Sequence, residues 1–422
     1  MKATGLLAYA ALGWPLAMAA LPVYVTAPQF YGAELGLNLA SLGLVLFLAR
    51  LVDTVQDPWL GRLVDAWQHK PAGWRRLMLL GGATLAASLF ALFTPPQLAS
   101  WGLHAWLAVC LVVVYTAHSL VNICYLAWGA RLTDDMDARS RVTAWREAAG
   151  LAGVLLASVL PVWLVQQYGA RQGYSFYALV FAVVLLLALA YTLRCTPPPL
   201  LPPKRAGAHW RLLLQPPAIR RLMLVYLINS LAVALPATLV LFYIADVLQA
   251  PTAAGGLLLV YFLAGALTLP CWVMLADRIG KAKAWLVGMV LGSCAFFWAA
   301  SLGSGDVWQF GVVCLLSGMA LGADLALPPA LLADLIPSGQ RQDTGLYFGI
   351  WAMLGKLALA LSAGLALPLL HGLGYVPGSP AAAGALAMIY AGVPCVLKLF
   401  NGLLLFSWSP AFRPQPLSEP TP

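Results

Sequence analysis

Long apolar runs alternate with short polar connections along the whole chain. A membrane-spanning helix needs roughly 20 apolar residues, and we identify twelve stretches of that kind. The runs lack the strict apolar–polar alternation of membrane β-barrel strands. We therefore predict an all-α membrane protein whose transmembrane helices cover residues 5–30, 37–64, 76–95, 101–130, 141–168, 173–194, 219–248, 254–277, 283–302, 307–335, 343–370 and 383–407.

Composition excludes several function classes. The chain is 62% hydrophobic and 9% charged, whereas a soluble domain carries about 25% charged residues. A soluble enzyme and a disordered protein are excluded, and so is a nucleic-acid binder, because the 24 Lys and Arg residues cluster only at membrane edges. Motifs for an intramembrane enzyme, such as HExxH and GxSxG, are missing. The seven cysteines include no CxxC pair, so we expect no disulfide framework, no metal site and no cofactor.

The basic residues predict the orientation of the helices. Nineteen of the 24 Lys and Arg residues lie at Lys2, Arg413 or the even-numbered connections, and only Arg171 lies in an odd-numbered one. Cytoplasmic connections of membrane proteins are enriched in Lys and Arg. We therefore expect a multi-pass protein of the inner cell membrane, in contact with the lipid bilayer, with both termini in the cytoplasm.

A proline-rich connection divides the predicted helices into two sets of six. Within residues 195–218, five prolines at 197–203 are followed by basic residues, and proline-rich segments act as semi-rigid spacers. Six helices on each side fit the parallel-repeat plan of many transporters. We predict an N-terminal half at 1–194, a cytoplasmic linker at 195–218, a C-terminal half at 219–410 and a cytoplasmic tail at 411–422.

Short basic turns recur at the same place in each predicted half. Each turn combines an Asp with basic residues, which suggests a charge clasp that latches cytoplasmic helix ends in one state and releases them in another. The alternative is a solvated turn that only follows the positive-inside rule. The clasp residues after the second and eighth helices are Asp65, Arg75, Arg76, Asp277, Arg278 and Lys281.

Two carboxylates lie inside the second predicted helix. Asp53 and Asp57 are four residues apart and share one helical face with Arg50. A charge at the bilayer centre costs about 2.5–3.5 kcal/mol, so such residues are functional candidates by default. Two carboxylates on one face need a proton, a sodium ion or a basic side chain between them. The alternative is a structural Arg–Asp pair, which leaves the second Asp unexplained.

Other polar residues inside the predicted helices extend the list of candidates. Lys356 is expected to face a water-filled cavity or a carboxylate, and Lys398 to have a structural role. Asn122, Tyr125 and Asn229 are polar points that either contact a substrate or bridge helices by hydrogen bonds. The remaining buried charges are Arg146, Glu147 and Asp324.

The pattern around these residues resembles the glycoside–pentoside–hexuronide cation symporters of the major facilitator superfamily. The segment 48–58, with Asp53 and Asp57, carries the most specific match, and 122–140 and 347–377 add further matches. The resemblance implies the major facilitator fold, with two pseudosymmetric six-helix halves around a central cavity, and coupled transport by alternating access. It also implies that Asp53 and Asp57 bind the coupling cation, near the hydroxyl of Ser119.

The resemblance extends to substrate contacts, with three departures. Arg146 falls where the family has a substrate-contacting Arg, and Lys356 where it has a functionally coupled Lys. Pro15 and Asn122 stand where sugar-binding acids are expected, and Trp14 replaces a Lys. The predicted cation site consists of Asp53, Asp57, Ser119 and Asn122. The predicted substrate contacts are Trp14, Asn122, Tyr125, Arg146, Asn229, Asp324 and Lys356.

These features together predict a symporter that couples a Na⁺ or H⁺ gradient to the uptake of a small organic solute such as a sugar or glycoside. Three alternatives stay open: a carrier of a lysolipid or another amphiphile, a proton-driven exporter, and a membrane scaffold or receptor that transports nothing. The expected partners are the small-molecule substrate and the lipid bilayer. A monomer is the usual state of major facilitator proteins, and we expect it here.

Overall fold

The computed structural model describes residues 3–67, 72–129, 132, 136–197, 216–336, 344–379 and 383–412. Within these ranges, twelve helices are long and apolar enough to cross a membrane. Every predicted helix is found, with ends that move by a few residues; the first, for example, spans Gly5–Glu34. Most of the predicted linker at 195–218 and of the tail at 411–422 lies outside the described residues.

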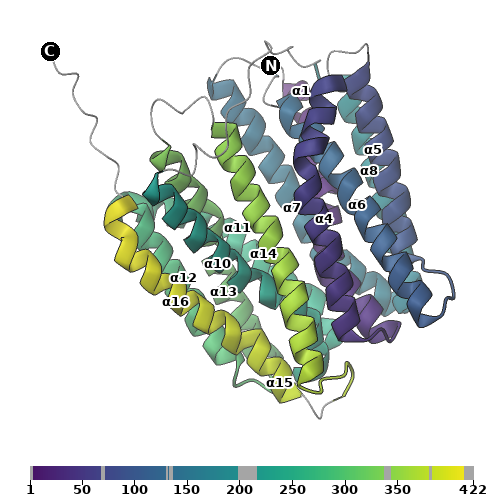
Figure 1. The fold of residues 1–422 in the computed structure, drawn as a ribbon, viewed down its shortest axis with the longest axis vertical. Coiled ribbons are helices and arrows are strands. Elements are labelled where there is room, and N and C mark those ends of the chain that lie inside the picture. The colour runs from purple at the N-terminus through teal and green to yellow at the C-terminus, as the bar shows by residue number, and fades with distance from the viewer. Residues whose placement is uncertain are drawn as a thin grey trace.

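The N-terminal half begins with a helix of several segments (Figure 1). Its first span joins α1 (Ala3–Ala11), α2 (Gly13–Leu21), a π-helical turn (Pro22–Thr26), α3 (Ala27–Gln29) and a second π-helical turn (Phe30–Glu34). Long continuous helices follow, and they are α4 (Leu39–Trp67), α5 (Gly73–Phe93), α6 (Ser100–Gly129), α7 (Met136–Tyr168) and α8 (Ala170–Cys195).

The C-terminal half repeats this plan. It begins with α10 (Pro217–Phe242), which continues into a π-helical turn (Tyr243–Val247). A 3₁₀ turn (Pro251–Ala253) then leads to four long helices, which are α11 (Ala254–Ile279), α12 (Lys281–Ala299), α13 (Val307–Leu335) and α14 (Thr344–Gly372). The last span joins α15 (Ala383–Ala387), a π-helical turn (Met388–Gly392) and α16 (Val393–Trp408), and it ends in a 3₁₀ turn (Ser409–Phe412). The first helix of each half thus ends in a π-helical turn. This shared local geometry agrees with the predicted internal repeat, although the exact domain boundaries stay a prediction.

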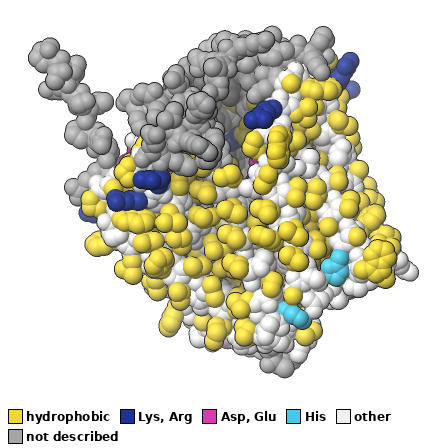
Figure 2. All heavy atoms as spheres, in the orientation of Figure 1, with side chains coloured by type: hydrophobic (Ala, Val, Ile, Leu, Met, Phe, Trp, Pro, Cys, Tyr) yellow, Lys and Arg dark blue, Asp and Glu magenta, His cyan; other side chains and the backbone are white. Residues whose placement is uncertain are grey.

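Apolar side chains cover the outside of the bundle, as a bilayer requires. Figure 2 shows one face covered largely by hydrophobic side chains, with Lys and Arg near one end. On α4 the exposed apolar residues form one stripe and follow one another at steps of three or four positions, so they share a single helical face. The stripe consists of Leu44, Leu48, Val52, Val55, Trp59 and Leu63.

The two halves pack together at the end of the bundle opposite the termini, which we call the closed end. There α4 crosses α14, and α7 crosses α11. Glycines permit the first crossing, because a Cβ atom on Gly43 would lie 2.8 Å from the carbonyl oxygen of Ala363 and 2.8 Å from Pro368. A Cβ atom on Gly364 would lie 3.0 Å from the ring of Phe47. The backbones therefore approach closely, as small residues allow in membranes.

Buried side chains confirm that the halves separate toward the other end. One apolar core continues from the N-terminal half into the closed-end residues of the C-terminal half, such as Tyr243, Leu367 and Tyr390. A second core contains only C-terminal-half residues, among them Trp285 and Tyr347. The two cores are distinct near the end that carries both termini, which we call the open end (Figure 1).

Replacing Gly43 with Val is expected to open the closed end. Overpacking costs about 1–3 kcal/mol, enough to shift a conformational equilibrium between two states. Spin labels at Trp101 and Trp308, which are 79% and 80% exposed on opposite halves, should report a longer distance by double electron–electron resonance.

The matched control is Gly61→Val on the same helix, where a new Cβ atom meets nothing within 4 Å. The control should leave the distance distribution unchanged. Equal distributions for Gly43→Val and the unmodified chain would show that this crossing does not hold the end closed.

Candidate functional site

The helical register of α4 places Asp53 and Asp57 one turn apart on the side that meets α6 and α14. The neighbouring apolar residues Val52 and Val55 are exposed on the outer stripe. The carboxylates therefore point into the bundle, where charges must be paired. Pro58 follows within the same helix and removes one backbone N–H from the hydrogen-bond pattern.

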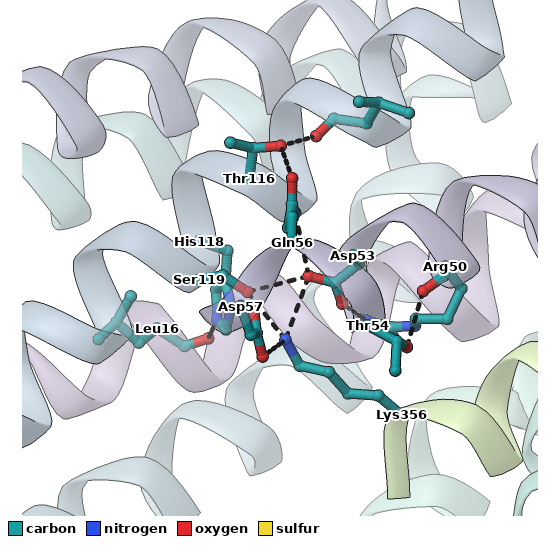
Figure 3. Close-up of polar contacts among 11 residues, drawn as sticks. Leu16, Arg50, Asp53, Thr54, Gln56, Asp57, Thr116, His118, Ser119 and Lys356 are labelled. Atoms are coloured by element: carbon teal, nitrogen blue, oxygen red, sulfur yellow. Dashed lines mark hydrogen bonds and ion pairs between the residues drawn. The ribbon is translucent and has the colours of Figure 1, made fainter. Parts of the chain in front are cut away.

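Lys356 on α14 bridges both carboxylates from the other half of the molecule (Figure 3). Its Nζ lies 2.5 Å from Asp57 Oδ2, 3.1 Å from Asp53 Oδ1 and 2.9 Å from Ser119 Oγ. Three oxygens from α4 and α6 thus converge on a single ammonium group. Asp53, Asp57 and Lys356, all singled out from the sequence, form one site together with Ser119.

Further donors hold Asp53 in place. Arg50 Nη1 donates to Asp53 Oδ2 at 2.9 Å, and the Ser119 hydroxyl donates to Asp53 Oδ1 at 2.9 Å. The Arg50 guanidinium also lies 4.2 Å from the ring centre of Tyr115, a cation–π contact. The carboxylate of Asp53 is therefore a fixed acceptor, satisfied on both oxygens.

Burial differs sharply across the site. The side chain of Asp53 is 2% exposed, whereas those of Asp57 and Lys356 are 31% and 23% exposed. Asp57 Oδ1 is a buried atom that finds no hydrogen-bond partner among the described residues. One carboxylate is thus sealed into the bundle, and the other has an oxygen available for a further ligand.

This arrangement suits a small cation. Carboxylate and hydroxyl oxygens are ligands for hard cations, and the Lys356 ammonium lies where such an ion would be held. Two carboxylates face two basic groups, Arg50 and Lys356, so the site is electrically balanced as it stands. Such a balance allows one positive charge at the carboxylates to be exchanged for another.

A family described as MFS/sugar transport protein matches residues 6–409 of the chain. The chain belongs to this family. It is therefore a transporter of the major facilitator superfamily and not an enzyme. The resemblance to the glycoside–pentoside–hexuronide symporters is confirmed at the level of the family.

Individual relatives agree with this assignment. The chain is 25% identical over 403 residues to a glucuronide carrier protein homolog of Escherichia coli (strain K12). This alignment covers 90% of this chain and 86% of that protein. It is 27% identical over 165 residues to the inner membrane symporter YicJ of the same organism, over 38% of this chain and only 36% of that protein's length. The solved structure of a mutant of the nucleoside transporter NupG shares the fold, with a TM-score of 0.74 at 14% identity, over 95% of this chain and 98% of that one.

A second buried charge cluster lies within the C-terminal half of the transporter. Lys398 Nζ is 2.9 Å from Asp324 Oδ2, and their side chains are 2% and 7% exposed. Asn229 Nδ2 and Trp285 Nε1 donate to Asp324 Oδ1 at 2.9 and 2.8 Å. The predicted substrate residues Asp324 and Asn229 are thus brought together with Lys398, and the carboxylate already accepts three hydrogen bonds.

Two predicted substrate residues are held by packing between α1–α2 and their neighbours. Tyr125 is 1% exposed, and its hydroxyl donates to the Tyr9 carbonyl at 2.8 Å, while the Tyr9 hydroxyl donates to the Tyr125 carbonyl at 3.0 Å. The Arg146 backbone packs against Gly13.

Trp14, next to Gly13, is 42% exposed. Asn122 lies one turn after Ser119 on α6 and is half-buried.

The clasp residues lie at the open end where they are described. Asp277, Arg278, Arg75 and Arg76 are exposed. Lys281 pairs with Asp334 at 2.6 Å, a contact inside the C-terminal half. The side chain of Asp65 lies outside the described residues, as does that of Glu147. The proposed latch between the halves stays a prediction.

Sequence reasoning missed several supporting residues. Gln56 Nε2 lies 3.5 Å from Asp53 Oδ1 and its Oε1 accepts from Thr116 at 2.8 Å, which links α4 to α6. Gln56 follows Asp53 by three residues, so helical spacing alone could have identified it. Trp285 lies near a helix start, where an interfacial role is the usual expectation, and no sequence signal connects it to Asp324.

Removing one member of the Lys398–Asp324 pair should destabilise the fold. Leaving a buried charge without its partner costs about 3–5 kcal/mol, whereas removing both charges is often nearly neutral. We expect Lys398→Met and Asp324→Asn each to lower the free energy of unfolding by that amount, and the double variant to recover most of it. Unfolding of the purified transporter in detergent–SDS mixtures measures the effect.

The exposed Lys281–Asp334 pair, with side chains 35% and 34% exposed, provides the control. Lys281→Met should change the free energy of unfolding by less than about 1 kcal/mol. If the double variant lost as much free energy of unfolding as the two single variants together, the two charges would do more than neutralise each other.

Proposed function

We propose that the transporter is a cation-coupled symporter that carries a small sugar-like solute into the cell. The observation that supports this most directly is the convergence of Asp53, Asp57 and Ser119 oxygens on the ammonium of Lys356. Two relatives, a symporter and a glucuronide carrier homolog, agree with it. Na⁺ and H⁺ are both compatible with two carboxylates and a hydroxyl.

In this proposal Lys356 acts as a tethered cation. Without a bound ion, its ammonium neutralises Asp53 and Asp57, so the carboxylates are never left unpaired inside the membrane. An incoming cation takes the same oxygens and releases Lys356. Because Lys356 belongs to α14 and the carboxylates to α4, this exchange also removes an ionic contact between the halves.

The open end faces the cytoplasm in this proposal, because the described chain begins and ends there and most of the Lys and Arg residues with described side chains lie there. The structure then represents an inward-facing state in which Lys356 occupies the carboxylates. Rocking of the halves about the α4–α14 and α7–α11 crossings would expose the site to the opposite face. Binding of cation and substrate should be reciprocal, each raising the affinity for the other by the same factor.

Loss of either carboxylate should abolish coupled uptake. We expect Asp53→Asn and Asp57→Asn to remove the accumulation of solute driven by a Na⁺ or proton gradient, since each loses a ligand for the ion. Proteoliposomes should be tested with labelled methyl β-D-glucoside, methyl β-D-glucuronide and isoprimeverose. Glu34→Gln, which changes an exposed carboxylate at the end of the first span, should leave accumulation intact.

If both Asp variants still accumulate a solute against its gradient, the coupling site lies elsewhere. If only one of them does, the carboxylate that it lacks is not a ligand for the coupling ion.

Removing the tethered cation should tighten ion binding. Lys356→Met eliminates a competing positive charge, and one unit charge at 4 Å is worth about 4 kcal/mol at an effective dielectric of 20. We expect the Na⁺ dissociation constant to fall by at least about tenfold, measured as Na⁺-dependent thermal stabilisation against choline. An unchanged or weaker Na⁺ response would show that Lys356 does not compete for the ion.

A further inference from the structure

Two histidines lie at the closed end of the bundle, one in each half. His371 is at the end of α14, and His104 is near the start of α6. Histidine side chains are visible at the surface near this end (Figure 2). The charge of a histidine ordinarily changes between about pH 5 and 8, so the partners of each ring decide what its protonation does to the structure.

His371 forms a hydrogen bond between the two halves. Its ring nitrogens Nε2 and Nδ1 lie 3.2 and 3.4 Å from the side-chain nitrogen of Asn38, the residue that directly precedes α4. A neutral imidazole has one nitrogen without a proton, and either tautomer places that nitrogen within reach of Asn38. The contact joins the closed-end termini of α4 and α14, the helices that cross at this end.

Helix α4 holds the amide of Asn38 in one orientation. Its Oδ1 accepts hydrogen bonds from the backbone N–H groups of Ala40 and Ser41 at 2.9 and 3.3 Å, as a helix N-cap does. A rotated amide would leave these N–H groups without that acceptor. The NH₂ group of Asn38 therefore faces His371, and an NH₂ group only donates. A protonated ring, which also only donates, cannot accept this hydrogen bond.

His104 meets its partners differently. Its Nδ1 donates to the Ser100 carbonyl at 2.6 Å, and its Nε2 lies 2.6 Å from Ser41 Oγ. The Ser41 hydroxyl also lies 2.9 Å from the Asn38 carbonyl. It donates to His104 when that ring is neutral, and to Asn38 when the ring is protonated and itself donates. Rotation of one hydroxyl thus accommodates a charged His104, whereas a charged His371 leaves two donors face to face.

Other charged groups near this end do not contact His371. Helices α4 and α10 pack against α14. The first span ends before α4 at the exposed Glu34, and the charged residues of α4 begin at Arg50, about three turns deeper. After α10, Asp246 accepts a hydrogen bond from the Tyr375 hydroxyl. Within the described residues none of these groups bonds to His371, so none supplies an acceptor for the protonated ring in this arrangement.

We propose that His371 and Asn38 form a pH-sensitive switch at the closed end. The neutral ring helps to hold the halves together, and protonation of the ring breaks this contact and raises the fraction of the transporter that is open at this end. In the orientation proposed above the closed end faces outward, so an acidic exterior turns the unloaded carrier toward that side. The switch acts without a bound ion or solute.

Spin labels at Trp101 and Trp308, read by double electron–electron resonance on the full-length protein in choline buffer, test the switch at about pH 8 and about pH 5.5. His371→Gln is the reference, because it keeps an oxygen acceptor at both pH values and retains the titration of the central carboxylates. Relative to this reference, acid should raise the ratio of open to closed molecules in the unmodified chain roughly two- to tenfold. His104→Gln, the matched control at the same end, should respond as the unmodified chain does.

Asn38→Asp reverses the expected response. Asp is also a favourable N-cap, and its carboxylate accepts from a neutral ring and pairs with a charged one. Relative to His371→Gln, acid should therefore favour the closed end in this variant. The proposal is overturned if the unmodified chain and His371→Gln respond equally to acid, or if Asn38→Asp responds with the same sign as the unmodified chain. It is also overturned if His104→Gln removes the response.

Discussion

Neutralisation of buried charge is the constraint on which the rest of this structure depends. Two carboxylates inside a membrane protein are tolerated only with positive partners, and here one partner, Arg50, comes from the same helix, while the other, Lys356, comes from the opposite half. The ionic contact is therefore also a mechanical one. Whatever replaces Lys356 at Asp53 and Asp57 changes how α4 and α14 are joined.

The two charge clusters have the same chemistry but different surroundings. Lys398 and Asp324 are almost fully buried, and both belong to the C-terminal half, so their pairing need not change when the halves move. Lys356 and Asp57 are partly exposed and belong to different halves. Burial and connectivity, more than residue type, separate a structural ion pair from one that can exchange partners.

The sequence predicted the twelve helices, since length and hydropathy are local properties. It also predicted that Asp53 and Asp57 share a face and that Lys356 faces a cavity or a carboxylate. It could not predict that Lys356 pairs with these two carboxylates, because Lys356 and Asp57 are 299 positions apart in the chain. For Tyr125, periodicity could not distinguish a cavity residue from one locked against Tyr9 by reciprocal hydrogen bonds.

The balance of charges at the site has a consequence for the membrane potential. Moving one elementary charge across 100 mV involves about 2.3 kcal/mol of electrical work. When Lys356 occupies the site, two negative and two positive groups move together as a neutral set. In the proposed symport cycle the voltage does no net work on these four groups as the halves rock without ion or solute, so we expect the unloaded carrier to return at the same rate in energised and de-energised membranes.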